Sequence, residues 1–148
     1  MDITADVELD AEPSRVRVWL ADLDRYPAWL SILAKADPLA DGGVLGAWAV
    51  ELRAKVGPLA RSKRLRMVRT IDEPEHLRFE RAETDDRHHA QWTLDVHLTP
   101  TGAGSHLTMV LHYGGGFAGG IVERLLADEI ESSKARLRSL LVDPPSSS

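Results

Sequence analysis

The hydrophobic period of the chain changes near residues 114–116, and this change constrains the fold more than any other feature. Before it, apolar and polar residues alternate in one segment after another, which is typical of strands with one buried face. After it, apolar residues recur at helical spacing as far as Val142, opposite a charged side. The sequence therefore predicts an α+β fold in which one long amphipathic helix covers one face of an antiparallel sheet.

The alternating segments predict about seven strands, the first of them over residues 3–9. Turns are expected at 41–43, 57–58, 72–75 and 101–104. A short helix should begin near Pro13, and a second, capped by Asp24, should carry Tyr26 and Trp29. We expect a curved sheet wrapped round the C-terminal helix, the helix-grip architecture, over residues 1–142. The Pro- and Ser-rich residues 143–148 should form a disordered tail.

Composition excludes several classes of function. The 148 residues suit one domain, and the absence of cysteine rules out disulfides and thiolate metal sites. A net charge of -5 is unlike that of nucleic-acid binders, and we interpret the basic run at 61–66 as a solvated strand face. The sequence has no secretory signal and no stretch that could span a bilayer, so we expect a cytoplasmic protein.

A helix laid across a curved sheet often leaves a gap that becomes a ligand pocket. The residues that share the inward parity predict the lining of such a pocket: Trp48, Val50, Leu65, Met67, Phe79, Trp92, Leu94, Met109, Leu111, Leu126 and Ile130. Trp48 and Trp92 are either walls of the cavity or core filler, whereas Trp29 is more simply explained as filler.

A few polar side chains share this inward side. Arg81 has the parity of Phe79, and a buried charge must be paired, reach water or meet a polar ligand group. Glu129 lies beside the apolar stripe of the helix and is a conceivable partner for Arg81. We expect Arg81, Tyr113 and Glu129 to lie at the rim of the pocket and to set its specificity.

Five histidines are candidate metal ligands: His88, His89, His97, His106 and His112. They form neither an HxH nor an HExxH motif, and alternation turns all except His88 away from the helix. We therefore expect solvated histidines and no metal site. Parity also predicts that His97 and His106 are neighbours across the 101–104 turn, where ion binding would be adventitious.

Catalytic chemistry has little support in the sequence. Acid–base catalysis needs a carboxylate, phenol or imidazole held away from water with a shifted pKa. Glu129, Tyr113 and His88 are weak candidates, and nothing in their spacing brings them together. No nucleophile motif or phosphate-binding loop is present, so we expect neither an enzyme nor a cofactor.

Several segments resemble those of a known superfamily. Residues 11–16 followed by Trp19 resemble the entry to its first helix, and residues 22–29 resemble its D-x-x-x-Y-P-x-W second helix. Residues 55–58 and 114–120 are similar to the branch that contains the carbon monoxide dehydrogenase accessory subunit. The chain thus resembles the START-like (SRPBCC) superfamily, which includes polyketide cyclase-like and lipid-transfer proteins. The resemblance implies a helix-grip fold that binds lipids, hormones, quinones or polyketides, and catalysis in only some members.

Three functions follow as hypotheses. The first is a carrier or sensor of an apolar small molecule such as a lipid, quinone or polyketide. The second is a polyketide cyclase or aromatase, which would need polar groups spread along the pocket. The third is an accessory protein for a larger enzyme, with an exposed apolar patch near Val44–Leu45 or Phe117. The apolar inward face favours the carrier, and a homodimer or partner enzyme stays open.

Overall fold

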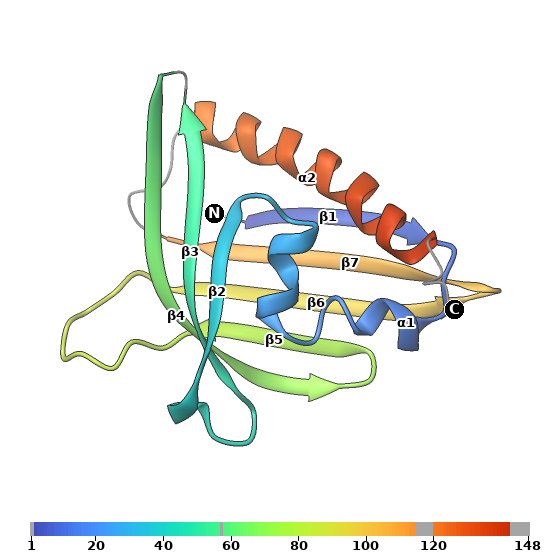
Figure 1. Cartoon of the computed structure of the whole chain (residues 1–148), viewed down its shortest axis with the longest axis horizontal. Coiled ribbons are helices and arrows are strands. Elements are labelled where there is room, and N and C mark those ends of the chain that lie inside the picture. The colour runs from blue at the N-terminus through green and yellow to red at the C-terminus, as the bar shows by residue number, and fades with distance from the viewer. Residues whose placement is uncertain (1, 57, 115–119, 143–148) are drawn as a thin grey trace.

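The structure is a computed structural model of the chain (Figure 1). It describes the backbone of residues 2–56, 58–114 and 120–142, with the side chains of these except 54–56, 59–61 and 120–127. Several predictions therefore lie outside the described residues: the tail at 143–148, the turn residue Gly57, Phe117, and the side chain of Leu126.

Seven strands form one antiparallel sheet, as the alternation predicted, and their order in the sheet is β1-β7-β6-β5-β4-β3-β2. The strands are β1 (Asp2–Leu9), β2 (Leu33–Leu39), β3 (Ala47–Val56), β4 (Leu59–Glu73), β5 (His76–Arg81), β6 (Trp92–Thr101) and β7 (Gly104–Tyr113). The helices are α1 (Pro13–Arg17), the 3-10 helices η1 (Leu23–Ala28) and η2 (Ala40–Gly42), and α2 (Gly120–Val142). The sheet curves, and α2 crosses its concave side (Figure 1). This arrangement confirms the helix-grip prediction.

The two short helices differ in detail from the prediction. Pro13 occupies the first turn of α1, as expected, but the helix ends at Arg17, before Trp19. The second helix is of the 3-10 type, and Asp22 rather than Asp24 is its N-cap residue. Asp24 instead accepts a hydrogen bond from the Trp48 indole at 2.9 Å. The carboxylate that the sequence suggested as a helix cap therefore links η1 to β3.

The β6–β7 hairpin corrects one predicted contact. His97 lies opposite Thr108, and His106 lies opposite Thr99, so the two histidines are offset by two residues and are not directly opposite as predicted. The strands pair as far as Thr101 and Gly104, and Gly102 adopts a φ of 53° that favours glycine. Parity fixes which face a residue occupies but leaves the register undetermined by steps of two residues. The predicted pairing of β6 with β7 was shifted by two residues from the observed register.

The concave face holds the core. Its buried residues come from all seven strands, from α1 and η1, and from the last turns of α2. Leu137 and Leu141 of α2 are buried, as the apolar stripe predicted. Within the described part of the chain, no helix has the length and apolar character needed to cross a membrane.

Candidate functional site

A cavity of about 150 Å³ lies between the sheet and α2 and is partly open to solvent. Eight residues of the predicted pocket line it: Val50, Leu65, Met67, Trp92, Leu94, Met109, Leu111 and Ile130. They come from β3, β4, β6, β7 and α2, and alternation brings them to one face because successive strand residues point to opposite sides. The cavity is therefore built from the inward half of the sheet, closed by one helix.

Other predicted lining residues lie elsewhere. Phe79 is fully buried and packs edge-on against Tyr26 and Trp48, with ring centroids 6.2 and 5.8 Å away. Trp48 is fixed by Asp24 and by the guanidinium of Arg69, 5.4 Å from its ring. Both aromatic side chains thus belong to the packed core under η1, although they share the parity of the cavity wall.

Sequence reasoning missed a second group of lining residues. They come mainly from β1, from the segment after η1 and from α2: Ile3, Ala5, Val7, Leu23, Trp29, Leu30, Ile32, Leu33, Leu52, Leu107, Ser133, Lys134 and Leu137. The alternation in β1 already turned Ile3, Ala5 and Val7 inward. Nothing local in the sequence indicated that β1 pairs with β7 and so comes to lie beside the cavity. Trp29, expected as filler, is part of the wall.

The polar content of the described lining is small. Apart from tryptophan indoles, only Ser133 and Lys134 carry polar side chains among the lining residues that the structure describes. The Ser133 hydroxyl donates to the Glu129 carbonyl at 2.6 Å, within the helix itself. The Lys134 ammonium lies 2.7 Å from Glu131. The cavity consequently offers burial and dispersion contacts, with one cation at its edge.

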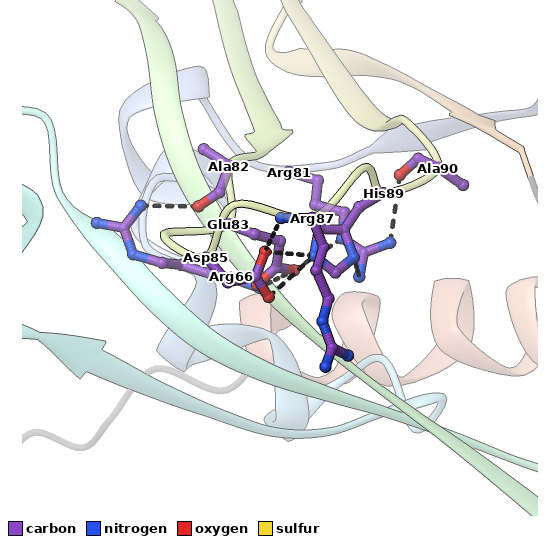
Figure 2. Close-up of polar contacts among 8 residues, drawn as sticks. All are labelled: Arg66, Arg81, Ala82, Glu83, Asp85, Arg87, His89 and Ala90. Atoms are coloured by element: carbon purple, nitrogen blue, oxygen red, sulfur yellow. Dashed lines mark hydrogen bonds and ion pairs between the residues drawn. The ribbon is translucent and has the colours of Figure 1, made fainter.

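Arg81 is not among the residues that line the cavity, and Figure 2 shows its polar contacts. Its guanidinium donates to Glu83 at 2.7 Å and to the Ala90 carbonyl at 3.2 Å, and it lies 3.2 Å from Nδ1 of His89. Because a guanidinium is only a donor, His89 accepts at Nδ1 and donates from Nε2 to Asp85, 2.8 Å away. Arg81 thus fastens the β5–β6 connection. The pairing of Arg81 with Glu129 that the sequence left conceivable does not occur, since Glu129 meets Ser31.

The three catalytic candidates stay apart. Glu129 accepts a hydrogen bond from the Ser31 hydroxyl. Tyr113 is buried and stacks on Trp92, with centroids 5.0 Å apart. His88 is exposed in the β5–β6 connection, outside β6, so its apparent parity with Trp92 has no structural meaning. None of these three side chains lines the cavity.

Comparisons with known proteins agree with this architecture. A family model described as "polyketide cyclase / dehydrase and lipid transport" matches residues 1–142. No curated protein matches the sequence.

Solved structures show the same fold at low sequence identity. TTHA0849 from Thermus thermophilus is 20% identical, with a TM-score of 0.72 over 96% of this chain and 97% of the other. A START superfamily protein from Mycobacterium smegmatis is 16% identical, with a TM-score of 0.70 over 95% and 96%. The ZhuI aromatase/cyclase from Streptomyces sp. R1128 is 14% identical, with a TM-score of 0.69 over 95% and 93%. At these identities the likeness establishes the fold alone.

Proposed function

Because the chain belongs to the polyketide cyclase, dehydrase and lipid transport family, we propose that it binds an apolar or amphipathic small molecule between the sheet and α2 without transforming it. The observation that carries the proposal is the chemistry of the lining. Hydrocarbon side chains form most of it, and Glu129, Tyr113 and His88 lie outside it. A pocket of this kind can retain a ligand but supplies few groups that move protons.

The cavity volume limits the part of the ligand that is enclosed. An apolar cavity of about 150 Å³ accommodates a molecule of the size of benzene, and this partly open cavity has about the same volume. We infer that it encloses one ring or a short alkyl segment in this arrangement. A larger ligand would extend through the opening or displace α2.

Lys134 indicates the polarity of the ligand's other end. It borders an otherwise apolar lining, and its aliphatic stem can lie on the cavity wall while the ammonium reaches water. If the ligand placed an anionic or strongly polar head group next to Lys134, the ammonium would exchange its partner Glu131 for that head group. We therefore propose an amphipathic ligand with an acidic or enolic end.

Micromolar affinity requires about 8 kcal/mol, which about 300 Å² of buried apolar area supplies before association costs.

The direct test fills the cavity. In Ala5→Phe a phenyl ring would project from β1 into the cavity, and the matched control Thr4→Phe places the same ring on the opposite, exposed face of the same strand. We expect 1-anilinonaphthalene-8-sulfonate to bind wild type and Thr4→Phe equally, and Ala5→Phe at least about tenfold more weakly. Decanoate and menadione should displace the probe. Equal binding by all three proteins would refute the site.

A turnover assay separates carrier from cyclase. The protein is incubated with a poly-β-keto mimic, and both retention and product are followed by mass spectrometry. Stoichiometric retention of unchanged mimic supports the carrier. Multiple turnovers that disappear in Tyr113→Phe or Glu129→Gln would overturn it in favour of a cyclase.

A further inference from the structure

The convex face of the sheet, opposite the cavity, brings two histidines and an aspartate together. His76 of β5 lies directly opposite His97 of β6 in the strand register, and their rings stack with centroids 4.3 Å apart. Asp95 precedes His97 by two residues and therefore shares its face. The carboxylate Oδ1 of Asp95 lies 2.7 Å from Nε2 of His76. Two hydrogen-bonded strands thus present three metal-ligating side chains at one point.

The spacing of these side chains suits a small cation. Each offers one ligand atom, and these atoms all lie within 4.8 Å of one another, the one such group among the residues that the structure describes. Zinc binds imidazole nitrogen at about 2.0–2.1 Å, so tetrahedral ligands lie about 3.4 Å apart. His97 is exposed and can rotate toward the other two, which are held half-buried. Ligand exchange with water stays possible on the exposed side.

Neighbouring side chains hold the carboxylate of Asp95 in place. Arg78 donates from Nε to Oδ1 of Asp95 at 2.7 Å. His76 also approaches Oδ1, with its Nε2 at 2.7 Å. Both hydrogen bonds end on Oδ1, which leaves Oδ2 for a cation. Arg78 thus fixes the orientation of the carboxylate.

We propose that His76, Asp95 and His97 bind one divalent transition-metal ion of the zinc class, with water completing the coordination. Histidine nitrogen with one carboxylate is a ligand set that such ions favour. The ion would join β5 to β6 from the side opposite the cavity, because Leu77 and Leu94, beside these ligands in sequence, face inward. No metal site was expected from the sequence because the histidines form no metal-binding motif, and His76 of β5 was not among the candidates considered with His97 of β6.

The test uses untagged, chelator-treated full-length protein, since a histidine tag would bind the same ions. We expect one equivalent of Zn²⁺ by calorimetry, and a visible Co²⁺ spectrum that reports nitrogen and oxygen ligands. His76→Gln, His97→Gln and Asp95→Asn should each weaken binding at least about tenfold. Zn²⁺ should raise the melting temperature of wild type and leave that of His97→Gln unchanged.

His106→Gln is the matched control on the same face. His106 contacts Glu8 through Nδ1 and Asp6 through Nε2. The two carboxylates therefore lie at different edges of the imidazole ring and cannot share an ion that is bound to one of its nitrogens. Zinc binding should be unchanged in this variant. No zinc binding to wild type, or equal loss in His106→Gln and His97→Gln, would overturn the proposal. Binding of 1-anilinonaphthalene-8-sulfonate should be the same in every variant, which separates this outcome from the cavity proposal.

Discussion

The concave face has two adjoining regions, a packed end under η1 and a cavity end beneath α2, which share one alternation pattern and are filled in different ways. Under η1, the Phe79 ring packs edge to face against Tyr26 and Trp48, and all three side chains are buried. Beneath α2, Leu94 and Met109 stay partly accessible around a cavity. Inward parity therefore selects the residues that face the helix side. The covering element decides whether the space between them is filled.

Hydrogen bonding explains much of the difference. At the packed end the Tyr26 hydroxyl donates to the Leu20 carbonyl at 2.9 Å, and the Trp48 indole donates to Asp24. Burial, with a smaller effect of Asp22, raises the pKa of Tyr26 and keeps its phenol protonated. The polar edges of these rings are satisfied, so each ring has one fixed orientation. The aliphatic side chains round the cavity have no such anchors.

Removing the ring at the centre of the packed end should have the largest effect. Phe79→Ala is expected to lower the free energy of unfolding by about 3–5 kcal/mol, because it empties a fully buried site held between two other rings. Urea denaturation measures the loss. Leu94→Ala changes the β6 partner of Phe79, which lines the cavity, and should cost only about 2 kcal/mol because that side chain already borders empty space. Equal losses of unfolding free energy in the two variants would contradict the distinction between a packed region and a cavity region.

A change at Trp48 tests whether the two ends are functionally separate. Trp48→Phe removes the hydrogen bond to Asp24 and weakens the contact with Arg69, at a cost of about 1–2 kcal/mol. Binding of 1-anilinonaphthalene-8-sulfonate should stay the same because Trp48 does not line the cavity. The same substitution at Trp92, which does line it, should weaken binding several-fold. Lost binding in Trp48→Phe alone would contradict the assignment.

Lys134 sharpens the description of the cavity end. Lys134→Met keeps an apolar stem of similar length and removes the charge at the edge of the lining. Thermal stability should change little, because the lost ion pair with Glu131 is a surface contact. Affinity for decanoate should fall several-fold while affinity for decanol, its uncharged counterpart, stays constant. A parallel loss for both ligands would mean that Lys134 acts through packing.

The smallest effect is expected on the convex face, at His106. Hydrogen bonds to Glu8 and then to Asp6 raise the pKa of His106 above its ordinary value. The resulting stabilisation is complete below an imidazole pKa of about 6.5, and it is lost as the pH rises through the higher folded value. Melting curves of wild type should therefore show a shallow decline over this range that His106→Gln removes. An unchanged slope in the variant would contradict the assignment.

Several features of the fold were readable from particular residues. The alternation at Ile3, Ala5 and Val7 predicted β1 and its inward side, and Pro13 marked the start of α1. Parity also identified Trp92 and Met109 as cavity residues. Each of these inferences uses only neighbours within one strand or one helical turn. Local periodicity is sufficient for them, because it follows from backbone geometry alone.

The errors came from relations between distant segments. The sequence could not show that Trp48 would reach Asp24, or that Glu129 would meet Ser31 instead of Arg81. The meeting of His76 with His97 depends on the β5–β6 register, which parity leaves undetermined by steps of two residues. Side-chain partners of this kind follow from how the strands pair and where the connections run.

Local patterning was thus enough to predict the order of the elements along the chain, the face on which each strand residue lies, and the apolar character of the space beneath the helix. Which inward side chains pack solidly, which leave a cavity and which outward ones meet depended on the assembled sheet and helices. The physical reason is that periodicity is a local property of the backbone. The volume between two layers, and the contacts across a register, depend on the joint placement of side chains that lie far apart in the chain.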